Sequence, residues 1–230
     1  MPIETYNGKT FVAFVDISGF KHYMKHEPEK AVKAIDSFFH NGYSILKTQH
    51  NEFKVEGIFV SDCCILFVRN ETRSANRIYK SFKSLLDIVK QLNIAMLRDN
   101  FMVTTSIAYG EFSYQDRIEF TGITKNPIIS NAYISAYLNS EVKPKIKPGQ
   151  CRIVKEDLPK KVDKSIYEAG NIDIIKMIRN RKYDTNNYYY YWTLDDSNEI
   201  DNFEINYTSA CKLDEKHKYD KILDLLKNRF

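Results

Sequence analysis

The chain has 230 residues, carries 34 lysines and arginines against 30 aspartates and glutamates, and is 43% hydrophobic. This length and apolar content suit one large domain or one domain with an extension. The net charge of +4, spread along the chain, argues against a nucleic-acid-binding protein. The four cysteines include an adjacent pair and no C-x-x-C spacing, so we expect reduced thiols and neither disulfides nor zinc.

No signal peptide and no apolar run of membrane-spanning length is seen, which predicts a cytoplasmic protein with no membrane partner. The first two thirds of the sequence alternate between strand and helix patterns. In chain order, we expect a strand at 10–15, a helix at about 28–46, a hairpin of strands at 53–59 and 63–68, a helix at 74–92, a strand at 101–112, a helix at 127–138 and a strand at 150–155. The opening order strand–helix–strand–strand–helix–strand predicts an α+β fold of the ferredoxin-like, split βαβ type.

From about residue 156 the pattern loosens. An apolar segment at 172–178, an aromatic strand at 188–192 and an amphipathic helix at 219–230 stand out. We therefore expect a domain at residues 1–155 and a C-terminal α/β extension at 156–230, packed on that same domain. The tyrosine run within 188–192 predicts a strand with both faces covered.

Two aspartates stand at the ends of apolar runs. Asp16 follows the first strand, and Asp62 lies in the turn that opens the third. In the split βαβ order these strands are antiparallel neighbours, so we expect the two carboxylates to share one corner of the sheet. Crowded carboxylates repel, and a divalent cation such as Mg²⁺ or Mn²⁺ relieves that repulsion. The alternative is a purely structural role, in which Asp16 caps a helix and Asp62 stabilises a turn.

The sequence Val-Asp-Ile-Ser-Gly-Phe at 15–20, followed by a helix and a hairpin whose turn carries a second Asp, resembles the catalytic domain of class III nucleotidyl cyclases over about residues 8–155. Ile-Ala-Tyr-Gly-Glu at 107–111 and Lys-Pro-Gly-Gln at 147–150 also fit that family. Ser-Asp at 61–62, in place of the usual Gly-Asp, and Asn-Ala-Tyr at 131–133 are similar to the pyrimidine cyclases of bacterial Pycsar anti-phage systems.

The resemblance implies a lyase that converts UTP, or as second choice CTP, to the 3′,5′-cyclic monophosphate and pyrophosphate. Asp16 and Asp62 would be catalytic and would bind two Mn²⁺ or Mg²⁺ ions, joined by the Ile17 carbonyl. The residues that would hold the triphosphate are Ser18, Gly19 and Phe20. The resemblance also implies a head-to-tail homodimer with interfacial sites, and a downstream effector that senses the cyclic nucleotide in anti-phage defence.

Several positions depart from the purine cyclases of the family. Ile58 stands where they read the base with a Lys, while Tyr133 and Tyr137 replace an Asn and a transition-state Arg. The base would then sit in a narrow pocket walled by Phe59 or Tyr133. The candidates to replace the missing arginine are Lys54, Arg69, Arg98, Arg117, Lys125 and Lys143, and the sequence does not choose among them.

Two alternatives stay open. A diguanylate cyclase or palm-type polymerase would use a similar fold, although their Gly-Gly-[Asp/Glu]-Glu-Phe turn is absent. A catalytically degenerate cyclase domain would keep the fold for dimerisation or nucleotide sensing, and the missing arginines favour that reading.

Overall fold

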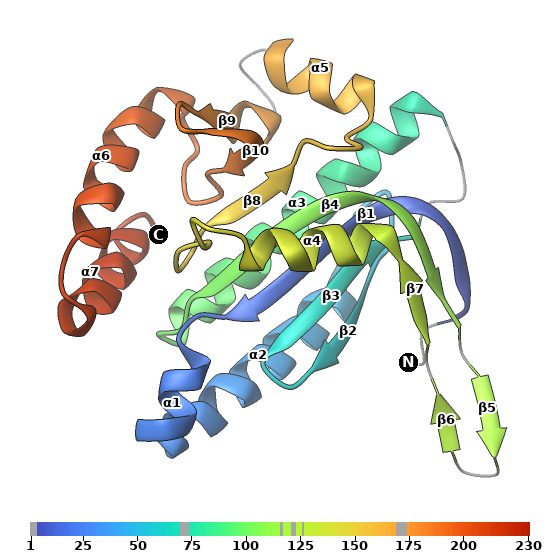
Figure 1. The fold of residues 1–230 in the computed structure, drawn as a ribbon, viewed down its shortest axis with the longest axis horizontal. Coiled ribbons are helices and arrows are strands. Elements are labelled where there is room, and N and C mark those ends of the chain that lie inside the picture. Colours follow the sequence, from blue (N-terminus) through green and yellow to red (C-terminus); the bar gives the residue numbers. More distant parts are fainter. Residues whose placement is uncertain (1–3, 70–73, 116, 121–122, 126, 169–173) are drawn as a thin grey trace.

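The computed structural model describes residues 4–69, 74–115, 117–120, 123–125, 127–168 and 174–230. Its main sheet has eight strands, seven of them in the order β2-β3-β1-β4-β8-β10-β9, with β7 paired to β4 (Figure 1). The strands are β1 Tyr6–Ile17, β2 Val55–Val60, β3 Cys63–Val68, β4 Val103–Tyr114, β7 Ile128–Ser130, β8 Cys151–Val154, β9 Ile178–Arg181 and β10 Asp184–Tyr190, and a separate hairpin joins β5 Arg117–Phe120 to β6 Ile123–Lys125.

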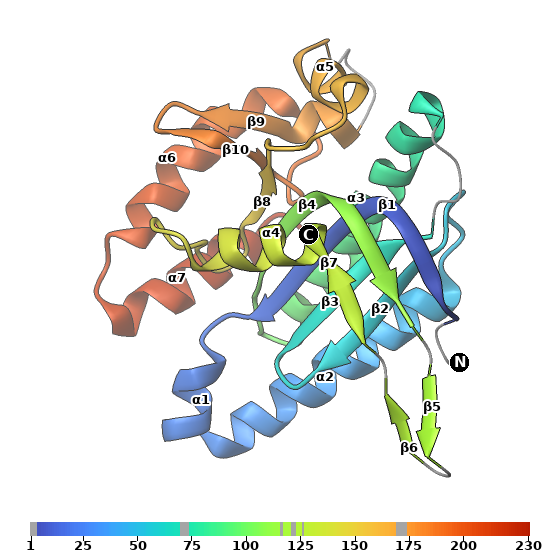
Figure 2. The ribbon, with the colours of Figure 1, turned by 45° about the vertical axis from the view of Figure 1, so that its right-hand side comes forward.

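Helices lie on both faces of this sheet. They are α1 Phe20–His26, α2 Pro28–Thr48, α3 Ala75–Arg98, α4 Asn131–Glu141, α5 Lys160–Glu168, α6 Ile200–Cys211 and α7 Glu215–Lys227, with 3₁₀ turns η1 Ile174–Met177 and η2 Ser197–Glu199. Figure 1 shows α4 in front of the central strands and α2 and α3 behind them, and the turned view in Figure 2 keeps α2 and α4 on opposite sides. No helix in the described part of the chain is both long and apolar enough to cross a bilayer.

The predicted ferredoxin-like order is confirmed. The strands β4, β1, β3 and β2 are neighbours in that order, and each pair is antiparallel. The first strand is longer than predicted because β1 pairs with β4 along its whole length, from Tyr6 opposite Tyr114 to Ile17 opposite Val103. The strand that carries the first aspartate is therefore held on both edges.

Two hydrophobic clusters sandwich β1, since successive side chains of a strand point to opposite faces. Phe11, Ala13 and Val15 belong to the larger cluster under α2 and α3. Val12 and Phe14 belong to the smaller cluster under α4. By this alternation, Asp16 points to the α4 side of the sheet.

The helix predicted at 127–138 is wrong over its first residues. Ile128–Ser130 form β7, which pairs with Phe112–Tyr114 of β4, and the helix begins only at Asn131. Its N-cap Ser130 accepts a hydrogen bond from the backbone N–H of Tyr133 at 2.8 Å, which fixes the start. Part of the apolar segment predicted at 172–178 lies outside the described residues; the rest forms η1 and the first residue of β9.

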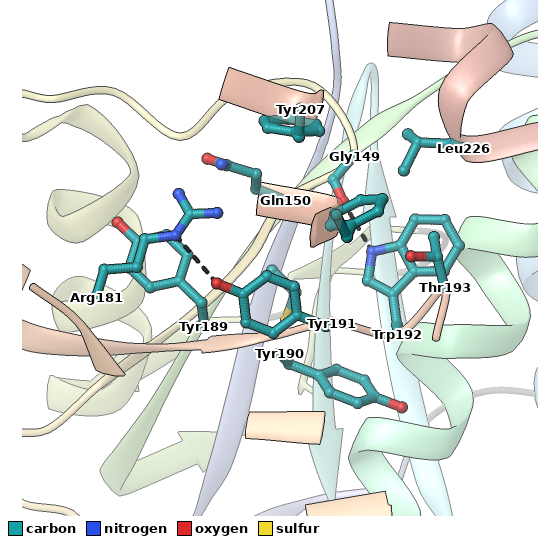
Figure 3. Close-up of a pocket in the computed structure, with 12 residues that line it drawn as sticks. Gly149, Gln150, Arg181, Tyr189, Tyr190, Tyr191, Trp192, Thr193, Tyr207 and Leu226 are labelled. Carbon is teal, nitrogen blue, oxygen red and sulfur yellow. Dashed lines mark hydrogen bonds between the residues drawn. The ribbon is translucent and has the colours of Figure 1, made fainter. Parts of the chain in front are cut away.

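The C-terminal elements continue the same sheet. Strand β10 pairs with β8 and with β9, and the tyrosines at 188–191 are all buried, as predicted. Figure 3 shows Arg181 beside Tyr189 and Tyr191; the guanidinium lies 3.9 Å from the Tyr189 ring centroid. The cavity among these side chains measures only about 20 Å³, room for roughly one water, so this region is packed interior.

Candidate active site

Asp16 and Asp62 meet at the end of β1. Asp16 is paired with Cys63, the residue directly after Asp62, and the backbone N–H of Ile17 donates to the Asp62 carbonyl at 2.9 Å. Ser61 reaches this tight turn with a positive φ of 55°. The sheet thus brings the two aspartates to one corner, as the strand order predicted.

The environment of Asp16 disfavours a bare negative charge. Burial, followed by the nearby charges of Asp62 and Glu141, raises the pKa of Asp16 from 3.8 to about 7, and the charge of Lys145 opposes the rise. Asp62 is exposed. A cation placed between these carboxylates would remove the penalty on ionised Asp16, so their arrangement favours cation binding.

The turn after β1 combines a strained glycine with a buried hydroxyl. Gly19 has φ 79°, a left-handed conformation that a side chain would strain, and its carbonyl accepts from His22 and Tyr23 to start α1. Ser18 is 5% exposed, and its Oγ has no hydrogen-bond partner among the described residues. The Ser18 N–H already donates to the Met102 carbonyl at 2.9 Å, so only the hydroxyl remains to meet a ligand. The Phe20 ring is buried in the larger core cluster.

The C-terminal helix α7 supports this turn from behind. The Tyr219 hydroxyl accepts a hydrogen bond from the Met102 N–H at 3.3 Å, and Met102 in turn holds Ser18. A methyl group added at Gly19 would lie 3.8 Å from the Tyr219 ring. The extension is therefore in direct contact with the turn that carries the candidate site.

A cleft of about 320 Å³ opens beside Asp16 on the α4 side of the sheet. Its polar lining comes from three segments: the β1 end, the start of β4 and the end of α4 with the loop after it. The lining residues include Asp16, Ser18, Gly19, Thr104, Tyr137, Ser140, Glu141 and Lys145. Lys145 forms an ion pair with Glu141 at 3.0 Å.

The two aromatic residues expected to wall a base pocket lie on opposite faces of the sheet. The Phe59 ring packs over Gly42 of α2 and 5.3 Å from the Phe38 ring, centroid to centroid. Tyr133 belongs to the α4 side, where Ile58 also packs. Within one chain, therefore, Tyr133 and Ile58 are on the same side as Asp16 and Phe59 is not.

The basic residues proposed from sequence are mostly far from the two aspartates or engaged elsewhere. Lys54 and Arg69 both bind Glu56, at 2.8 and 2.7 Å. Arg98 is exposed in the last turn of α3 and Lys143 in the loop after α4. The side chains of Arg117 and Lys125 lie outside the described part.

Sequence reasoning missed Lys145 and Glu141. Both lie where α4 ends and an irregular loop begins, so no periodic pattern assigned them a face. Their spacing of four residues was the available signal, because an acid and a base at i and i+4 can pair on one side.

The residues present fit a divalent-cation site that a substrate would complete. No three His, Cys, Asp or Glu side chains of the described residues gather closely enough to hold a metal ion on their own. Two carboxylates and one backbone carbonyl are nevertheless a usual share for Mg²⁺, which takes its remaining ligands from water and substrate phosphates.

Comparison with known proteins finds solved structures with a similar fold but no protein that matches by sequence. No protein-family model matches the chain, and no curated protein matches it by sequence. Solved structures that it resembles include the guanylyl cyclase Cya2 (13% identity, TM-score 0.52, 81% of this chain and 92% of that one). The adenylyl cyclase CyaB from P. aeruginosa gives 16% identity and TM-score 0.52, over 82% of this chain and 95% of that one.

The guanylate cyclase domain of RhGC from Catenaria anguillulae, solved with GTP, is also similar, at 12% identity and TM-score 0.53, with 82% of this chain and 98% of that one covered. These matches span most of both chains. The chain therefore has the fold of adenylyl and guanylyl cyclase domains, in agreement with the resemblance read from its sequence.

Proposed function

We propose that this chain, built on the nucleotide cyclase fold, converts a nucleoside triphosphate into its 3′,5′-cyclic monophosphate and pyrophosphate. The observation that carries the proposal is the pairing of Asp16 and Asp62 at one corner, beside a cleft that Ser18 lines and where its buried hydroxyl has no partner among the described residues. A chain that kept only the fold would have no need for a half-buried carboxylate next to another one.

Asp16, Asp62 and the Ile17 carbonyl would hold two Mg²⁺ or Mn²⁺ ions. Bound there, the ions would lower the pKa of the ribose 3′-hydroxyl and neutralise the leaving pyrophosphate. The chain itself supplies the Ser18 hydroxyl and the backbone at Gly19 and Phe20 for the triphosphate. Its rigid turn, held by Met102, keeps these groups in place before the substrate arrives.

We infer that the base is a pyrimidine, with UTP first and CTP second. Ile58, on the same side of the sheet as Tyr133 and Asp16, offers no hydrogen bond to a purine edge. A site that discriminates by polar contacts rejects a base whose partners are missing. On the resemblance to pyrimidine cyclases, the product would be a second messenger for a cyclic-nucleotide-sensing effector in anti-phage defence.

We also infer a homodimer with the sites at its interface. The face of α4 turned away from its own sheet carries apolar side chains in contact with solvent. They include Ile134 and Leu138, and Val142 directly after the helix, spaced four residues apart and each more than half exposed. A second copy of the chain is the partner that this apolar face would take.

The test is to incubate the purified protein with each of the four nucleoside triphosphates and Mn²⁺ and to identify products by mass. We expect a cyclic product, with kcat/KM for UTP or CTP at least about tenfold above ATP and GTP, a difference of only ~1.4 kcal/mol. A preference for ATP or GTP would contradict the pyrimidine assignment and leave the cyclase assignment standing.

Single substitutions connect the activity to the site. Asp16→Ala and Asp62→Ala should each retain less than about a tenth of the activity, because each removes a metal ligand. The control Asp36→Ala changes an exposed aspartate on α2 and should leave activity unchanged. If no triphosphate yields a cyclic product, the second candidate, a degenerate domain, is favoured; Tyr137 in the cleft, where relatives would have an Arg, is the observation behind it.

A further inference from the structure

Lys145 is the one cationic side chain among the described residues that line the cleft. It shares that lining with Asp16, Ser18 and Glu141. The chemistry proposed above concentrates negative charge there: the substrate brings a triphosphate, and the transition state spreads charge over phosphoryl oxygens. Two basic residues named from the sequence, Lys54 and Arg69, are instead paired with Glu56 at the far end of β2 and β3.

The loop that carries Lys145 is fixed at its backbone. Arg152, only 2% exposed, donates from Nη1 to the Pro144 carbonyl at 2.8 Å and from Nε to Asn139 Oδ1 at 2.8 Å. Further along, the Gly149 N–H donates to the Val103 carbonyl at 2.9 Å. The main chain on both sides of Lys145 is therefore anchored to the sheet.

The Lys145 side chain, in contrast, is held weakly. Its ammonium group contacts Glu141 at 3.0 Å, and the two side chains are 62% and 55% exposed. Exposed ion pairs contribute little to stability, so exchanging the carboxylate for a phosphate oxygen costs little. A lysine is a flexible point charge with three donors, well suited to such an exchange.

We propose that Lys145 is a phosphate-binding residue of this site, and that Glu141 holds its ammonium group until a polyphosphate takes the place of the carboxylate. The inference deepens the proposed function and rests on it. A second, independent observation points to the same ligand: the buried Ser18 hydroxyl in the same cleft has no partner among the described residues. Lysine and hydroxyl together would supply donors to phosphate oxygens.

The experiment measures binding of inorganic tripolyphosphate with Mg²⁺ by calorimetry, because this probe has neither base nor ribose and cannot react. We expect Lys145→Met to weaken binding at least about tenfold and Lys145→Arg to restore most of it. The matched control Lys147→Met removes an exposed lysine of the same loop that does not line the cleft, and should change binding less than about twofold. Glu141→Gln should strengthen binding severalfold, because it releases the lysine.

The inference would be overturned if Lys145→Met bound the probe like the wild type, or if Lys147→Met weakened binding equally. Absence of measurable binding to the wild-type protein at millimolar probe would also overturn it. The cyclase assay is separate. If binding depends on Lys145 but no cyclic product forms, the proposed function is contradicted and the phosphate site stands. If Lys145→Met forms a cyclic product at wild-type kcat/KM, the phosphate-binding role of Lys145 is contradicted and the proposed function stands.

Discussion

In the metal-free protein, ionisation of Asp16 destabilises the folded state. This side chain combines partial burial with a second carboxylate nearby, and both raise its pKa to about 7. Because the unfolded chain titrates this group near 3.8, the native state keeps a proton between about pH 4 and pH 7 that the unfolded state has lost. Stability is then lost as pH rises through that interval, the opposite of a salt-bridged aspartate.

We therefore predict that the free energy of unfolding of metal-free protein falls by a few kcal/mol between pH 5 and pH 8, at about 1.4 kcal/mol for each unit of pKa shift. Asp16→Asn should flatten this fall and should be more stable than wild type at pH 8. The measurement is urea unfolding at several pH values with a chelator present. A wild-type curve parallel to that of Asp16→Asn would refute the assignment.

Glu56 shows how a single residue can contradict a strand pattern. In an extended strand Glu56 points to the face opposite Phe53, Val55 and Phe59, where a charged side chain is expected to meet solvent, yet it is only 6% exposed. Its carboxylate accepts two hydrogen bonds from Arg69, at 2.7 and 3.1 Å, and one from Lys54 at 2.8 Å. Because Arg69 directly follows β3, 13 residues from Glu56, local sequence could not predict that pair.

We predict that Arg69→Met lowers the free energy of unfolding by about 3–5 kcal/mol, since it leaves a buried carboxylate unpaired. Lys54→Met, the control on the exposed side of the same carboxylate, should cost less than about 1 kcal/mol. Activity per folded molecule should be unchanged in both. Arg69 lies six residues beyond Cys63, or roughly 20 Å along the strand from the aspartates.

At the scale of elements, periodic segments were predictable and short or irregular ones were not. The strands β1 to β4 and β8 carry apolar or alternating runs, and the helices α2, α3 and α7 carry runs of period three to four. These segments predicted the topology and hence the meeting of Asp16 with Asp62, whereas the short strands β5, β6, β7 and β9 were not predicted. Helix α1 has only seven residues, too few for a period to register. Lys145 was missed because it lies in a loop whose place depends on the buried Arg152.

Contacts between distant elements were also beyond sequence patterns. Tyr219 is the first residue of the predicted amphipathic helix at 219–230, but its hydroxyl also accepts a hydrogen bond from the Met102 N–H just before β4. The sequence around Tyr219 or Met102 contains no pattern that predicts this hydrogen bond. The bond makes α7 a positioning element for Ser18 and Gly19.

We predict that Tyr219→Phe lowers kcat/KM for the preferred triphosphate three- to tenfold, the effect of losing one hydrogen bond of about 0.5–1.5 kcal/mol. The ring stays, so the melting temperature should fall by only a few degrees. Tyr43→Phe, which removes an exposed phenol on α2, is the control and should match the wild type. An unchanged kcat/KM would show that the bond supports folding alone.

At the scale of the whole molecule, the two faces of the sheet differ in how they are covered. The α2 and α3 side is closed by long helices, whereas α4 is the one helix of the described residues in the smaller cluster on the other side, and it presents apolar residues outward. Exposed apolar side chains gathered on one helix beside a cleft indicate an interaction surface. The proposed homodimer would cover it.

We predict that Ile134→Asp converts a dimer to a monomer and lowers activity at least tenfold at micromolar protein, because a charge would be buried against the partner. Ile205→Asp, at an isoleucine of α6 that is 66% exposed, should leave the assembly intact. Light scattering coupled to size exclusion measures the mass, and activity of the wild type should rise more steeply than linearly near its dissociation constant. A monomeric wild-type protein with full activity would contradict an interfacial site.

The bond between Tyr219 and Met102 spans 117 residues of sequence. A growing chain on the ribosome completes β1, its aspartate and the turn at Ser18 long before residue 219 emerges. During that time the turn lacks one of its supports, and a chain that stops short of α7 never gains it. The proposed chemistry therefore becomes available late in synthesis, and an unfinished chain would be a poor source of product.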